Sequence, residues 1–312
     1  MTTYLLLTGA GFTHNWGGWL AKELEGDLLG RLATIPALQR LVQNAANFEE
    51  ALDTARGSFA GDQVRALEMA VKDSFQAMNA ALAERFSMFL GGKEHVVDFL
   101  ARFDSIFTLN QDLLLEIHYN ALREGSRWKG TYYPGVIPST LPAPTLPPHK
   151  DEVLRRARRV GSIGAAEELQ QPIYKLHGSV DWTDDSGDLF VVGGGKDTYI
   201  ESKPLLVEYF RVFRERLLAP NTRLMVIGYG WNDVHVNRAI FDAAKSNHSL
   251  GLFHVNPSGR EAILGPREAP IARYSTSTLA PLKCIGESRR ALTTTFGGDN
   301  LEYEKLMRFF VQ

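Results

Sequence analysis

Short runs of apolar residues recur along the chain, and glycine or polar residues follow most of them. These runs predict buried β-strands at Tyr4 to Leu7, Ser105 to Leu109, Ile173 to Leu176, Asp188 to Val192, Thr222 to Ile227 and Leu250 to Val255. Between several of them, apolar residues spaced by three and four predict amphipathic helices, such as Pro204 to Leu218 and Val234 to Ser246. Such alternation is typical of an α/β fold with a doubly wound, Rossmann-like parallel sheet.

Residues 27–92 depart from this alternation. Their apolar positions recur at helical spacing over long stretches, and no strand pattern interrupts them. So many helical residues between the first and second strands exceed a simple crossover. We therefore expect a helical module inserted into a sheet domain that is formed by residues 1–26 and 93–312.

Residues 124–171 form a second irregular region, within the sheet domain. Six of the 14 prolines lie between Tyr132 and Lys150, and prolines at this density prevent regular helices and strands. Long connections in compact domains are usually functional. The pattern favours a lid over a site or an assembly surface, with a passive linker as the alternative.

Composition narrows the function only modestly. A hydrophobic content of 44%, a charged content of 22% and a net charge of -2 are ordinary, so we expect no direct nucleic acid binding. The single cysteine, Cys284, cannot form an intrachain disulfide or a cysteine-based zinc site, which favours a reducing cytoplasm and no bound metal. No apolar stretch approaches 18 residues, and no signal peptide is recognisable, so we expect no membrane span.

The residues that follow the strands carry the candidate chemistry. Glycines come after the first strand and again after Ile227, while Asn110, His177 and Asn256 follow three other strands. The carboxyl ends of parallel strands meet at one edge, where open α/β sheets bind ligands. Glycine turns at such ends let backbone N–H groups approach phosphates. The combination predicts a nucleotide site.

Asp112 and His177 also have purely structural explanations. Asp112 fits the N-cap of the helix predicted at Leu113 to Ala121. His177 fits a general base, because imidazole titrates near neutral pH, but it could also be a turn histidine that is hydrogen-bonded to Asp181. The residues alone leave both alternatives open.

The order of these motifs resembles the sirtuin (silent information regulator) family. The chain has Gly-Ala-Gly, then Thr-x-Asn-x-Asp, then His-Gly, then a glycine turn, then Val-Asn. More narrowly, it is similar to the bacterial NAD-consuming branch found in antiphage defence. The resemblance covers the sheet segments, roughly half of the chain, and adds nothing on the helical module or the proline-rich region.

The resemblance implies a role for each matching residue. It places the NAD pyrophosphate at Gly9, Ala10 and Gly11, the nicotinamide ribose at Asn110, a loop-supporting carboxylate at Asp112, a general base at His177, the phosphate turn at Gly228, Gly230 and Asp233, and the adenosine ribose at Asn256. NAD+ would be the substrate, and the reaction would break the nicotinamide–ribose bond.

Two departures from the family pattern argue against protein deacylation. Deacylating sirtuins carry four zinc-binding cysteines, and this chain has only Cys284. They also have an acidic segment after the Gly-Ala-Gly turn that recognises nicotinamide, where this chain has Phe12 to Gly18; Phe12 and Asn15 are the candidates for that contact.

The expected function is therefore an NAD+ hydrolase that releases nicotinamide and ADP-ribose as a regulated, NAD-depleting effector in antiphage defence. The alternatives are a deacylase or ADP-ribosyl transferase, and a sensor subunit that binds NAD or ADP-ribose without turnover. We expect a homo-oligomer whose activity is controlled by a separately encoded partner, such as an ATPase or translocase.

Overall fold

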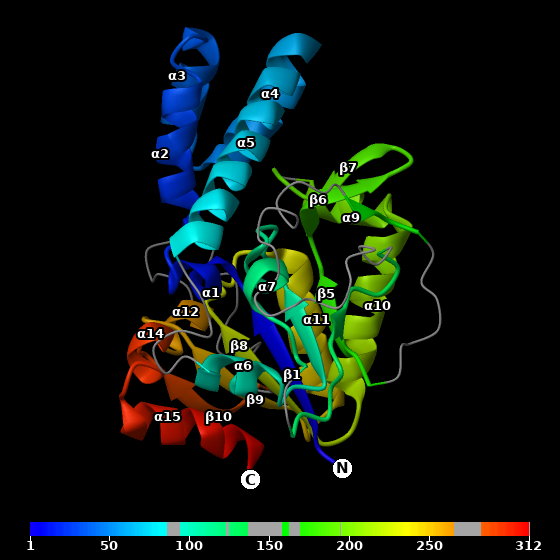
Figure 1. Cartoon of the computed structure of the whole chain (residues 1–312). Coiled ribbons are helices and arrows are strands. Elements are labelled where there is room, and N and C mark those ends of the chain that lie inside the picture. The colour runs from blue at the N-terminus through cyan, green and yellow to red at the C-terminus, as the bar shows by residue number, and fades with distance from the viewer. Residues whose placement is uncertain are drawn as a thin grey trace.

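A seven-stranded sheet forms the centre of the protein in the computed structural model, which describes residues 1–85, 94–122, 125–136, 158–161, 169–193, 195–264 and 282–311. The strand order is β10-β9-β8-β1-β2-β5-β3, and all adjacent strands in this sheet are parallel (Figure 1). The strands are β1 (Thr3–Thr8), β2 (Ser105–Thr108), β3 (Thr131–Tyr132), β5 (Gln171–Lys175), β8 (Thr222–Ile227), β9 (Gly251–Val255) and β10 (Lys283–Ser288). The predicted Rossmann-like α/β fold is confirmed.

The strands are apolar on both faces because helices cover both faces of the sheet. Along β1, Leu6 packs into one hydrophobic core, whereas Leu5 and Leu7 pack into the other, as the two-residue period of a strand requires. One face is covered by α9 (Lys196–Glu201), α10 (Pro204–Leu218) and α11 (Val234–Ser246). The other carries α6 (Glu94–Leu100), α14 (Leu292–Thr295), α15 (Asn300–Met307) and the 3-10 helix η1 (Arg308–Phe310).

The described part of the insertion, residues 27–85, is mostly helical, as its pattern predicts. The helices here are α2 (Ala21–Arg31), α3 (Pro36–Asn44), α4 (Phe48–Ser58) and α5 (Gly61–Arg85), which extend beyond the carboxyl ends of the strands (Figure 1). Their buried side chains belong to the same hydrophobic core as Leu6 and Ile106 of the sheet. The division into separate domains at residues 27 and 92 therefore stays a prediction.

A small second sheet lies beside the main one. In it, β6 (Gly178–Asp184) pairs with β7 (Gly187–Phe190) in an antiparallel hairpin and with β4 (Arg158–Arg159) in parallel. The strand predicted at Asp188 to Val192 corresponds to β7, which ends two residues earlier, and β6 was not predicted. Most of the proline-rich region lies outside the described residues, so its role as a lid or assembly surface stays a prediction.

Three shorter elements also differ from expectation. The glycine turn after β1 contains a helix of one turn, α1 (Ala10–His14), and the helix after β2 is shorter than predicted, at α7 (Leu114–His118). The carboxyl-terminal region, where no strand was predicted, supplies the edge strand β10, and α12 (Glu261–Leu264) follows β9.

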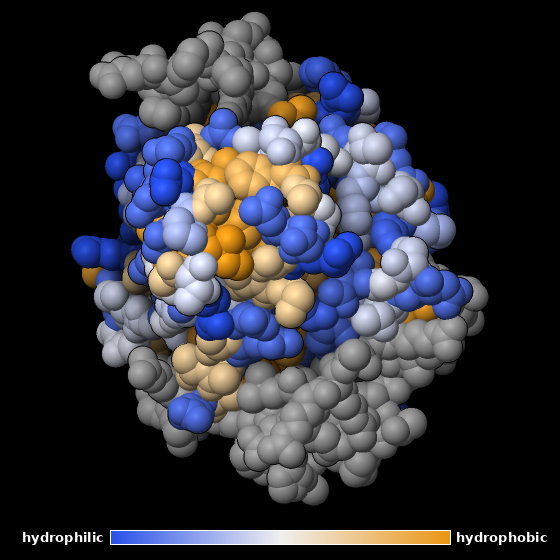
Figure 2. Space-filling view, turned by 90° about the horizontal axis from the view of Figure 1, so that it is seen from above, coloured by the Kyte–Doolittle hydropathy of each residue, from blue (hydrophilic) through white to orange (hydrophobic). Residues whose placement is uncertain are grey.

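The surface beyond the strand ends is mixed in character. Viewed from above, it shows a group of hydrophobic residues near its centre that is bordered by hydrophilic ones (Figure 2). Among the residues that the structure describes, none of the helices has the length and hydropathy of a membrane-spanning segment.

Candidate functional site at the carboxyl ends of the strands

The predicted site residues follow five neighbouring strands. Gly9, Asn110, His177, Gly228 and Asn256 come one or two residues after β1, β2, β5, β8 and β9. The last residues of these strands lie side by side, since Thr8 pairs with both Thr108 and Ile227. The sheet therefore brings the five positions to one rim, as expected for a ligand site in an open α/β fold.

Two glycine turns on this rim pack against each other. The Gly11 N–H donates to the Gly228 carbonyl at 2.9 Å. Gly228 has φ of +64°, and a Cβ there would stand 2.2 Å from the Phe12 nitrogen. A Cβ on Gly11 would stand 2.8 Å from the Gly228 Cα. Contact between the two turns thus requires these glycines even without a ligand.

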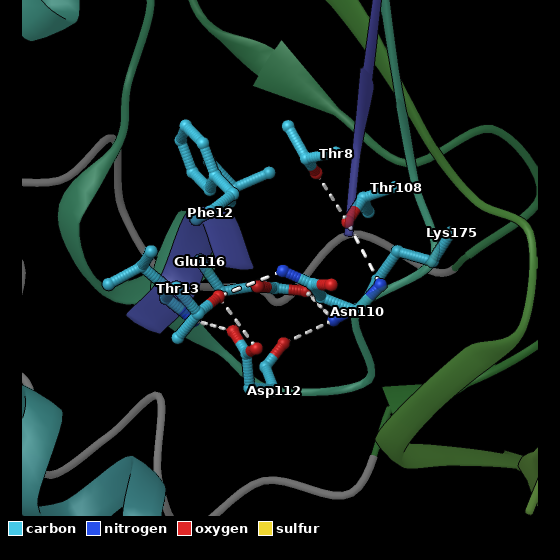
Figure 3. Close-up of a pocket in the computed structure, with 10 residues that line it drawn as sticks. Thr8, Phe12, Thr13, Thr108, Asn110, Asp112, Glu116 and Lys175 are labelled. Atoms are coloured by element: carbon cyan, nitrogen blue, oxygen red, sulfur yellow. Dashed lines mark hydrogen bonds and ion pairs between the residues drawn. The ribbon is translucent and has the colours of Figure 1, made fainter. Parts of the chain in front are cut away.

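Asn110 and Asp112 are joined through Thr13 of α1 (Figure 3). The Asn110 amide donates to the Thr13 hydroxyl at 2.8 Å, and this hydroxyl donates to Asp112 Oδ2 at 2.8 Å. The other Asp112 oxygen accepts from the Leu114 N–H at 3.0 Å, at the start of α7. The N-cap of α7 is Leu113 rather than the predicted Asp112, but Asp112 still accepts from the first turn of this helix and is joined to the Asn110 loop through Thr13. Burial raises the pKa of Asp112.

A buried ion pair lies beneath these residues. Lys175 Nζ is 2.8 Å from Glu116 Oε1 and donates to the Asp112 carbonyl at 2.6 Å. The Lys175 and Glu116 side chains are 2% and 1% exposed. They line a small pocket of about 10 Å³ with Thr8, Thr108 and Asn110 (Figure 3), which has room for a water molecule but not for a nucleotide. The ion pair of Lys175 and Glu116 was not predicted from the sequence.

His177 contacts a second histidine that was not predicted. The two Nε2 atoms of His177 and His235 are 2.9 Å apart, and His177 is 3% exposed. Burial lowers the pKa of His177 to about 3 and also lowers that of His235. Both rings are therefore neutral at pH 7, so the two facing nitrogens share one proton.

The partner of the other His235 nitrogen indicates where that proton lies. His235 Nδ1 is 3.1 Å from Asp197 Oδ1, which favours a proton on Nδ1 and a lone pair on Nε2. His177 Nε2 is then the donor of the contact. For His177 to accept a ribose proton through this nitrogen, the two rings must exchange the shared proton or separate.

Asp233 completes this second group. Its Oδ1 accepts from Lys196 Nζ at 2.8 Å, and Lys196 also pairs with Glu49 Oε1 of α4 at 2.8 Å. Burial opposes ionisation of Asp233, but attraction to His177 and Lys196 keeps its pKa below the ordinary value. The ligand atoms of His177, Asp233 and His235 all lie within 4.8 Å of one another, a set that could hold a metal ion.

The remaining candidates stand in structural hydrogen bonds or packing. Phe12 is 1% exposed and its ring centroid is 4.7 Å from that of Trp16. Asn15 donates to the Gly11 carbonyl at 2.6 Å and accepts from the Leu292 N–H at 2.7 Å. Asn256 donates to the Tyr229 carbonyl at 3.3 Å and accepts from the Ser258 N–H at 2.9 Å. Their predicted contacts with NAD stay predictions.

A parallel α/β sheet whose rim carries glycine turns, an amide and a histidine defines a nucleotide-binding class of protein. Within this class, the family model of the SIR2-like domain matches residues 104–268, more than half of the chain, and the chain belongs to that family. The matched segment contains Asn110, His177 and the Gly228 turn, but not the turn after β1. No curated protein matches the chain. Family membership indicates an NAD-related activity.

Proposed function

We propose that this protein is an NAD+ hydrolase. The observation that carries the proposal is the placement of Asn110 and His177 after two neighbouring strands, since Thr108 of β2 pairs with Lys175 of β5. An amide and an imidazole at adjacent strand ends can hold one ribose between them, which is what cleavage at its anomeric carbon requires.

The proposed reaction breaks the bond between the nicotinamide nitrogen and the ribose carbon. Its electron pair leaves with nicotinamide, which becomes neutral, and the ribose becomes an oxocarbenium-like cation. His177 would stabilise this cation by accepting a proton from a ribose hydroxyl, and Asn110 would hold the ribose. Water then bonds to the same carbon and releases one proton, and His177 returns its proton to the ribose hydroxyl, which yields ADP-ribose.

Cysteine content separates this proposal from deacylation. With Cys284 as the only cysteine, the chain cannot supply the four-cysteine zinc module of deacylating sirtuins. Water is therefore the proposed acceptor, and an acyl-lysine or another ADP-ribosyl acceptor is the alternative. A protein that binds NAD without turnover is the remaining alternative, and the buried contact of His177 with His235 fits it as a resting state.

The test is to incubate the purified protein with NAD+ and resolve nicotinamide, ADP-ribose and cyclic products by chromatography. We expect His177→Ala and Asn110→Ala each to lower nicotinamide release by about 10²- to 10⁴-fold. His248→Ala, at an exposed histidine, is the matched control and should keep the parent rate. Wild-type turnover by His177→Ala would refute the catalytic assignment.

Control of the activity belongs to the same proposal. An unrestrained NAD+ hydrolase would deplete the cytoplasmic NAD+ of its own cell, so we propose a homo-oligomer that a separate ATPase or translocase activates during antiphage defence. The Glu49–Lys196–Asp233 contact supports control through the helical insertion, because it joins the insertion to the rim. Light scattering combined with the NAD+ assay tests it; a fully active monomer would contradict it.

A further inference from the structure

The group of His177, Asp233 and His235 has the geometry of a metal site. The two histidine Nε2 atoms face each other at 2.9 Å, and the Asp233 carboxylate lies within 4.8 Å of both. In a tetrahedral zinc site with Zn–N bonds of about 2.0 to 2.1 Å, two ligand nitrogens stand about 3.3 Å apart. Separation of the rings by a few tenths of an ångström would therefore place both nitrogens on one ion.

A neighbouring carboxylate orients one ligand. Asp197 Oδ1 is 3.1 Å from His235 Nδ1, which directs the lone pair of Nε2 toward His177. Histidines that bind metals commonly donate their other N–H to a carboxylate in this way. The Asp197–His235 pair thus supplies the outer half of a carboxylate–histidine–metal arrangement.

The charges around the group also favour a divalent cation. Asp233, Asp197 and Glu49 contribute three negative charges, and Lys196, which contacts Asp233 and Glu49, contributes one positive charge. The guanidinium of Arg214 also acts on His235, so the sum is -1, a net negative charge that attracts a divalent cation. Lys196 bonds Oδ1 of Asp233, which leaves the other carboxylate oxygen for the ion.

Access to the group is possible from one side. His177 is 3% exposed, whereas the side chains of His235 and Asp233 are 11% and 13% exposed. An ion can therefore enter past His235 and Asp233. Two imidazoles and a carboxylate suit Zn²⁺ better than the hard cations Mg²⁺ and Ca²⁺, and they leave a fourth position for water.

We propose that His177, Asp233 and His235 bind a divalent transition-metal ion, with Zn²⁺ as the best fit, and that this ion competes with NAD+ cleavage. The competition rests on the proposed function, because His177 Nε2, once its proton has moved to the other ring nitrogen, either binds the ion or accepts the ribose proton. Metal binding itself is independent of any activity.

Cobalt titration tests the ligand set without NAD+. Chelator-treated protein is titrated with Co²⁺, whose visible absorption reports tetrahedral coordination, and Zn²⁺ is then added to displace it. We expect one equivalent to bind. His235→Ala and Asp233→Asn should each weaken binding by at least 10-fold, and Asp197→Ala should weaken it by about 10- to 100-fold.

Two variants control for other ligands. His248→Ala changes an exposed histidine and Cys284→Ser removes the only thiol, so neither should alter the titration. Absence of the cobalt band, or a band that survives in His235→Ala and Asp233→Asn, would overturn the site.

Comparison of metal-free and Zn²⁺-loaded protein in the NAD+ assay tests the competition. We expect nicotinamide release to fall in step with site occupancy. Unchanged or increased release on loading would overturn the competition and leave the metal site standing. Inactivity in both states would overturn the competition as a property of the isolated protein, whereas the cobalt titration would still decide the site.

Discussion

The rim has two polar groups that are built on different principles. Around Asp112, Lys175 and Glu116, the ionic groups are buried at the carboxyl ends of the strands. The side chains of Lys175 and Glu116 are only 2% and 1% exposed. Around His177 and His235, two neutral rings share one proton, and the neighbouring Asp197 carboxylate is exposed at the surface. The first group is rigid, because loss of either member of the ion pair would leave an unpaired charge in the interior. The second can exchange a proton or accept an ion.

Lys175→Met is expected to have the largest effect on stability. It removes the cation that is paired with Glu116 and leaves a negative charge in the interior, which typically costs about 3 to 5 kcal/mol. Urea unfolding gives the free energy directly. The matched control is Lys72→Met, in a more exposed pair with Asp188, which should cost less than about 1 kcal/mol. Equal losses for the two variants would mean that the buried pair is not a fixed scaffold.

Gly228→Ala is expected to have the next largest effect on stability, because Gly228 lies in the turn that packs against Gly11 and Phe12. The φ of +64° at this position disfavours alanine by about 1 to 3 kcal/mol, and the added Cβ also meets the Phe12 backbone. Thermal unfolding should show a lower Tm. Gly26→Ala, at an open and exposed position of α2, should instead stabilise by about 0.5 to 1 kcal/mol. The same sign for both variants would contradict the steric explanation.

Acid should weaken the protein through the second group. The pKa of folded His177 is about 3, against an ordinary value of 6.5. Between these values the unfolded chain binds a proton that the folded protein does not, so stability falls as the pH is lowered. The loss at pH 5 is about 2 kcal/mol from this residue. His177→Gln should flatten the pH dependence between 7 and 5, and an unchanged slope would show that His177 is not buried as a neutral ring.

The groups that face His177 modify this profile without reversing it. His235, whose own pKa is lowered by burial, adds to the loss in the same direction. The charges of Asp233 and Lys196 act on His177 with opposite signs, the first raising and the second lowering its pKa. His235→Gln is therefore the second variant to compare, and its slope should lie between those of the parent and His177→Gln.

The sequence was informative where structure is determined locally. Strands such as Thr222–Ile227 are buried on both faces, so a continuous apolar run marks them. The parallel sheet then carried Asn110 and His177 to one rim. The predicted N-cap at Asp112 was one residue early, since α7 begins at Leu114 with Leu113 as its N-cap, although Asp112 still accepts from the Leu114 N–H.

The missed features depend on distant partners or on partial burial. β10 lies at the sheet edge with Lys283 exposed, so its pattern is weak. Lys175 within an apolar strand was a usable signal of a buried ion pair, but its partner Glu116 lies 59 residues away. His177 and His235 are 58 residues apart. The spacing of these residues along the sequence therefore does not reveal the group that they form with Asp233.

Asp197→Ala should have the smallest effect on stability and a clear effect on the His177–His235 pair. The Asp197 side chain is 63% exposed, and its contact with His235 is an exposed pair that contributes less than about 1 kcal/mol. Its orienting effect is larger than its energy suggests, because it holds the His235 proton on Nδ1 and so decides which ring donates to the other.

Nitrogen NMR of the imidazoles should show the Nδ1–H form of His235 in the parent and a mixture of tautomers in Asp197→Ala. Asp242→Ala, at a 62% exposed carboxylate paired with Lys245, is the matched control and should leave the histidine signals unchanged. The same tautomer in parent and variant would mean that the protein fixes His235 without Asp197, and the second group would then be as rigid as the first.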